Sequence, residues 1–154
     1  MPATTRVVLH VIVLVIASMV QALEPMHWDT ERPQNTVFVG KRITMSRVIF
    51  GATGTASITD NTYIDCHITV PDVDGVTIAF RDSVFGNTAV VLEMPLDGAP
   101  SSARKFFTAH FTNGSSVVSE RMGRNNVVTF FRTVVEKASR IDLSGFMYRC
   151  CNSI

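Results

Sequence analysis

The chain has 154 residues, of which 46% are hydrophobic and 18% charged; this is the composition of a folded domain and excludes a wholly disordered chain. The formal net charge of +1 is too small to draw the chain to nucleic acid or to a membrane surface, so it excludes proteins that bind these through their overall charge. Residues 23–100 contain 5 Lys or Arg and 10 Asp or Glu, whereas residues 101–154 contain 8 and 3. The basic residues of the second half are spaced apart, which favours a solvated surface or head-to-tail contact between copies over a nucleic-acid face.

Residues 1–22 have the features of a secretory signal peptide. One positive charge, Arg6, precedes an apolar run over residues 7–20, and small or β-branched residues follow up to Ala22. This order predicts cleavage after Ala22. The alternative is an uncleaved membrane anchor, but the 14 residues of the run are fewer than the ~20 needed to cross a bilayer. In both cases the segment engages a membrane during export.

The remaining residues alternate between β-rich runs and turn signals. Residues 23–35 contain two prolines, Trp28 and several charges, and we expect an irregular leader there. No later segment has the pattern of a capped amphipathic helix, and β-branched and aromatic residues dominate the apolar runs. Strands, some with their following turns, are predicted at residues 36–40, 42–50, 57–66, 76–87, 89–94, 106–114, 116–120, 127–135 and 141–150.

A recurring pattern within these runs predicts the fold. SITDNTYIDC (57–66) and VTIAFRDSVFGN (76–87) share an order of aliphatic strand, polar residues, aromatic residue and turn. ITMSRVIFG (43–51) and RIDLSGFMYRC (140–150) align with them by eye. Stacking of such units predicts an all-β protein with a right-handed parallel β-helix, a solenoid, over residues 36–154. We expect its C-terminal end to be incomplete or uncapped, because the chain ends just after a strand.

The aromatic residues that would mark successive coils are unevenly spaced. Phe50, Tyr63, Phe85, Phe111 and Phe146 are separated by 13, 22, 26 and 35 residues, and the last interval is long enough to contain another coil around Val134. Solenoids usually keep a tighter period, so an antiparallel β-sandwich is the alternative fold.

The three cysteines, Cys66, Cys150 and Cys151, are an odd set. In an oxidising compartment one of them stays free or pairs with another chain, so an intermolecular contact through a free cysteine is expected, while the pairing stays open. No C-x-x-C pattern occurs, which argues against a zinc or redox site. Cys66 is expected to be a small buried apolar residue.

Four acids, Asp60, Asp65, Asp72 and Asp74, lie close together in the sequence. They have the chemistry of calcium ligands, or of the carboxylates of a β-helix glycosidase or lyase with Arg81 as the nearby basic residue. Turn formation explains them more simply, because Asp favours tight turns and the pattern lacks the closing Glu of a calcium loop. We therefore predict no catalytic, cofactor-binding or metal-binding residue.

Other polar residues have simple interpretations too. His67 and His110 lack a partner at metal-ligand spacing and are expected to be strand residues. Arg104-Lys105-Phe106-Phe107 joins cations to aromatics, as in single-strand binders, but charges in a loop before a core strand explain it, and no nucleic-acid partner is predicted. Asn113-Gly114-Ser115 is both a turn signal and an N-glycosylation sequon, with Asn113 as the predicted site.

The β-helix-like fragments, the signal peptide, VVLEMPLDGAPSSARKFF (90–107) and IDLSGFMYRCC (141–151) resemble the dispersed-gene-family surface proteins of trypanosomes. The resemblance covers residues 37–151. It implies an extracellular, adhesin-like β-helix. Members of that family are much longer and carry C-terminal membrane spans, so the resemblance implies an N-terminal piece or a truncated copy.

Together these features predict a protein of the secretory pathway, secreted or at the cell surface, that is not an enzyme. Its expected partners are a host-cell surface, the extracellular matrix or glycans, which it would contact through exposed side chains. One alternative is a carbohydrate-active β-helix enzyme that uses the acids named above. Another is an inactive fragment of a longer surface protein.

Overall fold

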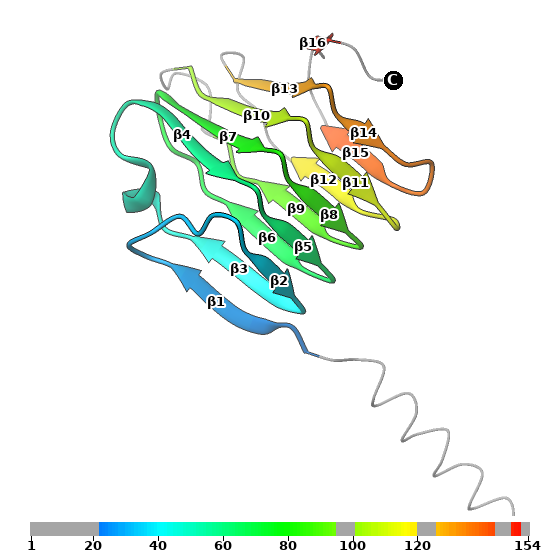
Figure 1. Cartoon of the computed structure of the whole chain (residues 1–154). Coiled ribbons are helices and arrows are strands. Elements are labelled where there is room, and N and C mark those ends of the chain that lie inside the picture. Colours follow the sequence, from blue (N-terminus) through cyan, green and yellow to red (C-terminus); the bar gives the residue numbers. More distant parts are fainter. Residues whose placement is uncertain (1–21, 95–100, 120–125, 144–148, 152–154) are drawn as a thin grey trace, which may run out of the picture.

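The chain folds into the predicted parallel β-helix (Figure 1). The computed structural model describes residues 22–94, 101–119, 126–143 and 149–151, which form a β-solenoid of about four turns with about 4% helix. The strand pairings of these residues are all parallel, which excludes the antiparallel sandwich. No helix in the described part of the chain is long and apolar enough to cross a membrane. The predicted signal peptide lies almost wholly in residues 1–21, outside the described residues, so cleavage after Ala22 stays a prediction.

The strands stack into three sheets, which we call A, B and C (Figure 1). Sheet A contains β1 (Glu24–Trp28), β3 (Lys41–Met45), β6 (His67–Val70), β9 (Ala89–Leu92), β12 (Ser116–Ser119) and β15 (Arg140–Leu143). Sheet B contains β2 (Val37–Val39), β5 (Thr62–Ile64), β8 (Val84–Gly86), β11 (His110–Thr112) and β14 (Val134–Val135). Sheet C contains β4 (Gly54–Thr59), β7 (Val76–Arg81), β10 (Ala103–Phe107), β13 (Val127–Phe131) and β16 (Arg149–Cys151). A short 3-10 helix, η1 (Arg47–Phe50), lies between β3 and β4.

Three corners join the sheets, and they differ in how regular they are. The C–B corner, from sheet C to sheet B, has two residues in each of its four turns from Thr59–Thr62 to Phe131–Val134. The B–A corner has one to four residues, and the A–C corner has five to ten. Insertions in the A–C corner therefore account for most of the variation in coil length, while the strands stay in register.

Two stacks of aromatic rings form the centre of the core. In-register parallel strands lie ~4.8 Å apart, so equivalent inward side chains lie directly above one another. In sheet B the neighbouring ring centroids are 5.3, 5.1 and 4.6 Å apart, and in sheet C 5.3 and 5.0 Å. Edge-on contacts such as Phe85–Phe106, at 6.1 Å and 74°, join the two stacks. The buried rings are Phe38, Tyr63, Phe85 and Phe111 in sheet B, and Phe80, Phe106 and Phe130 in sheet C.

The structure confirms two details of the predicted repeat. Residues 57–66 and 76–87 are equivalent parts of successive coils, because Ile58 pairs with Phe80 and Tyr63 pairs with Phe85. The long interval after Phe111 does contain a further coil, since Val134–Val135 forms β14 and Val135 pairs with Phe111.

The predicted alignment of the other two fragments, 43–51 and 140–150, with the repeat was wrong. Ile43 and the start of RIDLSGFMYRC lie in sheet A, whereas the fragments they were aligned with begin in sheet C. The expected strand over 42–50 ends at Met45, because the chain turns into η1 and then Gly51, which has a φ of 72°. Phe50 is therefore not part of the sheet B stack. Phe38 occupies that level of the stack, because it is the residue that pairs with Tyr63, and Phe146 lies outside the described residues.

The prediction of an irregular leader over residues 23–35 was wrong at its start. Residues 24–28 form β1, which pairs with β3 and buries Trp28 against the Phe38 ring at 5.6 Å. Pro25 argued against a strand because it has no N–H to donate. Here β1 lies at the edge of sheet A, where a missing donor breaks no ladder bond.

Replacement of Phe85 tests the importance of the ring stacks. Phe85→Ala should lower the free energy of unfolding by about 3–5 kcal/mol, because it removes a buried ring that packs on both stacks. Val84→Ala, on the exposed face of the same strand, should cost about 0.5 kcal/mol. Urea unfolding measures both values, and similar losses in the two variants would contradict the assignment of faces.

Candidate functional site

The four predicted acids lie at three different corners of one coil. Asp60 lies in the C–B corner and Asp65 in the B–A corner, on either side of β5, while Asp72 and Asp74 lie in the A–C corner before β7. Their closeness in sequence therefore does not bring all four to one site. The described residues include no group of three or more His, Cys, Asp or Glu side chains that could hold a metal ion.

Backbone conformation explains why acids occupy these corners. Asp60, Asp65 and Asp82 have φ values of 56°, 53° and 49°, in the left-handed region that Asp and Asn tolerate better than most residues. The N–H of Asp60 donates to the Arg81 carbonyl at 3.1 Å, and that of Asp82 donates to the Phe107 carbonyl at 2.9 Å. The interpretation of these acids as turn residues is thereby confirmed. The same conformation recurs in stacked positions along both corners, at Asn35, Asp60, Asp82, Thr108 and Arg132, and at Gly40, Asp65, Asn87 and Asn113.

Asp82 is a corner residue whose relation to Asp60 the sequence did not reveal. Thr59 pairs with Arg81, so the two carboxylate residues that follow lie one above the other on adjacent coils. Both are exposed. The signal lies in the equivalence of T-D-N and R-D-S, which becomes visible only when Ile58 is aligned with Phe80.

Small polar side chains inside the corners satisfy the backbone. Thr88 Oγ1 accepts from the Cys66 N–H at 3.2 Å and donates to the Gly86 carbonyl at 3.0 Å. Cys66 is buried as predicted, with Sγ 3.2 Å from the Ile64 carbonyl, and burial raises the pKa of its thiol. Asn61 Nδ2 donates to the buried Tyr63 hydroxyl at 3.1 Å, and burial raises the pKa of Tyr63 well above its ordinary value of 10.0. The side chains of Cys150 and Cys151 lie outside the described set.

The B–A corner also contains the sequon and borders a groove of about 770 Å³. Asn113 is exposed there, whereas Ser115 is fully buried and donates to the Phe85 carbonyl at 2.7 Å. N-glycosylation of Asn113 stays a prediction.

The groove is lined in part by Glu24, Asp65, His67 and Asn87, and Asp65 accepts from Asn87 Nδ2 at 2.7 Å. His67 is partly buried in β6 and His110 lies on the outer side of β11, so both are strand residues, as expected.

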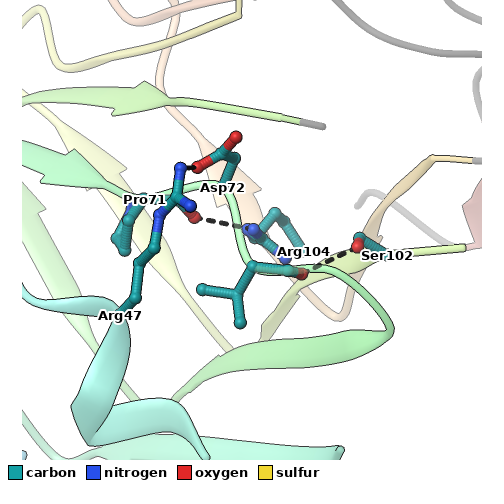
Figure 2. Close-up of polar contacts among 6 residues, drawn as sticks. Arg47, Pro71, Asp72, Ser102 and Arg104 are labelled. Atoms are coloured by element: carbon teal, nitrogen blue, oxygen red, sulfur yellow. Dashed lines mark hydrogen bonds and ion pairs between the residues drawn. The ribbon is translucent and has the colours of Figure 1, made fainter. Parts of the chain in front are cut away.

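Arg104 is the largest fully buried side chain of the described residues (Figure 2). It belongs to β10, in register with Ile78 and Val128, and not to a loop as predicted. Its guanidinium donates only to backbone carbonyls, with Nη2 2.7 Å from Pro71 O and Nη1 3.0 Å from Ala103 O, and no ion pair involves it among the described residues. Its buried Nε has no hydrogen-bond partner among the described residues. Burial lowers the pKa of Arg104 to about 10.

This arginine fixes the A–C corner before β7. Figure 2 shows its guanidinium directed at Pro71, while Ser102 donates to the Val73 carbonyl at 2.8 Å. Asp72, one of the predicted acids, forms an ion pair with Arg47. The cluster therefore contains a carboxylate that already has a cation and an arginine held by backbone, which is a structural arrangement.

The segment Arg104-Lys105-Phe106-Phe107 divides between two environments because it is a strand. Arg104 and Phe106 face the core, and Lys105 and Phe107 are half-buried on the outer face of sheet C. Arg81, the predicted basic partner of the acids, lies on the same outer face with its guanidinium carbon 4.4 Å from the Phe107 ring centroid. It is thus directed at an aromatic ring and forms no ion pair with a described acid.

The outer face of sheet B is the most apolar exposed surface of the described chain. Five of the eight exposed large hydrophobic side chains belong to it, with exposed fractions of 37–65%. Strand alternation explains this arrangement, because each inward ring is flanked by outward residues. The V-F-V pattern at 37–39 carried the signal, but sequence reasoning did not use it. We call this surface the valine face; it comprises Val37, Val39, Ile64, Val84 and Val134.

Comparison of the chain with protein-family models, with curated proteins and with solved structures finds no match. The resemblance to trypanosome surface proteins therefore stays a prediction.

Arg104 variants separate the contribution of its volume from that of its charge. Arg104→Ala should lower the free energy of unfolding by about 3 kcal/mol, because it leaves a cavity and unpaired carbonyls. Arg104→Met should lie within about 1 kcal/mol of the wild type, because removal of the desolvation cost of the guanidinium offsets the carbonyls left without this donor. Urea unfolding measures both, with exposed Arg42→Ala as the neutral control. A methionine variant as unstable as the alanine variant would show that the guanidinium hydrogen bonds hold the corner.

Stability should fall as the pH rises from about 8 toward 9.5, below the pKa of about 10 at which Arg104 acts in the opposite direction. Cys66 and Tyr63 have ordinary pKa values of 9.0 and 10.0 that burial raises, so in this window the unfolded chain loses protons that the folded chain keeps. Because the folded state then binds more protons, the free energy of unfolding decreases with pH. Urea unfolding at several pH values measures the slope, and Tyr63→Phe should reduce it. An equal slope in that variant would contradict the role of Tyr63.

Proposed function

We propose that this protein is a non-enzymatic, secreted or cell-surface β-solenoid that adheres to partner proteins through the valine face of sheet B. The observation that supports this proposal is the concentration of exposed aliphatic side chains on the outer face of one sheet. Exposed apolar side chains gathered on one surface mark interaction sites more often than hydrophobic residues scattered singly do. The predicted signal peptide and exposed Asn113 support the secretory route.

The surroundings of the valine face resemble the anatomy of a protein interface. Its described strands carry no charged outward residue; the remaining positions are Thr62, Gly86, His110 and Thr112. Charged corner residues flank it, with Asp60 and Asp82 along the C–B corner and Asp65 along the B–A corner. An apolar centre with a polar rim is the usual organisation of a protein–protein interface.

Side-chain chemistry favours a protein partner over a glycan at this face. Sugar rings are usually held by aromatic platforms and convergent polar groups, whereas this face presents β-branched aliphatic side chains on a rigid backbone. Five stacked strands span roughly 20 Å along the solenoid axis. That extent suits a small, reversible contact and not a permanent interface. Adhesion through many copies on one surface would then add up by multivalency.

Binding to matrix proteins and cells tests the proposal. The purified secreted chain should bind saturably to immobilised laminin, fibronectin or collagen, or to a mammalian cell monolayer. The double variant Val39→Lys/Ile64→Lys should weaken this binding at least about tenfold, because it places two charges at paired apolar positions of the contact.

A matched control keeps the total charge change the same. Val48→Lys/Val127→Lys alters two exposed valines outside the valine face and should bind like the wild type. Urea unfolding confirms that both variants fold. The proposal fails if the wild type binds none of these surfaces, or if the control loses as much binding as the sheet B variant.

A further inference from the structure

We propose that the outer face of sheet C binds an acidic polysaccharide. The site, which we call the Arg–Phe patch, comprises Arg81, Lys105, Phe107, Phe131 and Arg132. It lies on a different sheet from the valine face, so this inference does not depend on the protein-binding role. Strands β7, β10 and β13, which carry the patch, are neighbours in Figure 1.

Register builds the patch from three successive coils. Arg81, Phe107 and Phe131 occupy paired positions on adjacent strands, and Arg132 follows directly at the C–B corner. The Arg81 guanidinium lies 4.4 Å from the Phe107 ring centroid, and the Arg132 guanidinium lies 5.4 Å from that of Phe131. The two rings are 6.0 Å apart, edge to face. Each arginine is thus held over an aromatic ring, which limits its freedom before a ligand binds.

The cations of the patch are available to an anion. Arg81, Lys105 and Arg132 form no ion pair within the described part of the chain. The polar contact of Arg81 is a 3.4 Å hydrogen bond from Nε to Ser57 Oγ, which leaves its terminal N–H groups to donate. Asp82, the neighbouring acid, lies in the corner and pairs with neither arginine.

The spacing suits an extended polyanion that runs along the solenoid axis. The three cations belong to three successive coils, so they extend over roughly 10 Å at one strand spacing per coil. Planar guanidinium groups donate two parallel hydrogen bonds to sulfate or carboxylate oxygens. A linear polysaccharide that repeats such oxyanions can therefore meet successive coils of the solenoid.

The arrangement of the rings favours a polysaccharide over single-stranded nucleic acid. Nucleobases bind by stacking on open aromatic faces. Here Arg81 covers one face of Phe107, and Phe131 meets that ring edge-on. Both rings are only partly exposed. The patch thus presents cations supported by rings, and recognition by charge and hydrogen bonds is what it can supply.

Retention on heparin and binding to hyaluronate test the inference and distinguish sulfate from carboxylate as the recognised group. The wild-type chain should bind at least one of these polymers at 150 mM salt, a condition that we choose to suppress weak contacts. Arg81→Gln/Lys105→Gln/Arg132→Gln should bind about tenfold more weakly, because three contacts to oxyanions are lost. The conservative variant Arg81→Lys should keep part of the binding, because it retains the charge but not the planar donor fork.

A second triple variant controls for net charge. Arg42→Gln/Lys137→Gln/Arg140→Gln removes three exposed cations elsewhere and should bind like the wild type. Binding to heparin alone or to hyaluronate alone would identify the anionic group and support the proposal. The proposal is overturned if both triples lose binding equally, if neither polymer binds, or if oligothymidylate binds more tightly than both.

Discussion

The structure depends on keeping successive coils in register at one strand spacing. A slip of one residue in any coil would turn its inward ring to solvent and break both aromatic stacks at that level. The register stabilises the fold by placing aromatic rings 4.6–5.3 Å apart in the stacks. It also has an unfavourable consequence at the corners, where residues such as Asp60 and Asp82 adopt a left-handed conformation so that the next strand stays in line. The acids at those positions therefore have a conformational role in the turns.

Register also explains why outward residues form continuous surfaces. Each outward position is repeated along the solenoid axis, so a preference for one residue type becomes a column on the surface. On sheet B this produces the valine face, and on sheet C it places Arg81 beside Phe107 and Phe131. The backbone beneath is rigid because both edges of each inner strand are paired. Such surfaces are prepared for binding without rearrangement, which lowers the entropic cost of a contact.

Arg104 departs from the apolar rule of the interior and shows how the A–C corner is controlled. This corner varies most in length, so its residues do not stack on equivalent residues of the neighbouring coils as regularly as those of the other corners. A buried guanidinium that donates to Pro71 and Ala103 carbonyls ties one such loop to the strand of the next coil. Desolvation opposes the arrangement, as the lowered pKa of Arg104 indicates. The arginine therefore contributes to the specificity of the corner at some cost in stability.

The sequence by itself determined the β class, favoured the parallel solenoid over a sandwich and indicated the turn role of the corner acids, because these follow from local strand and turn chemistry in residues 57–87. It also indicated the additional coil at Val134. Only the tertiary structure decided that Phe38 and not Phe50 joins the ring stack, that Arg104 is buried, and that Arg81 lies over Phe107. Each of these depends on how successive coils align across A–C loops of unequal length. This alignment depends on packing between residues that are distant in the sequence, so local sequence patterns do not predict it.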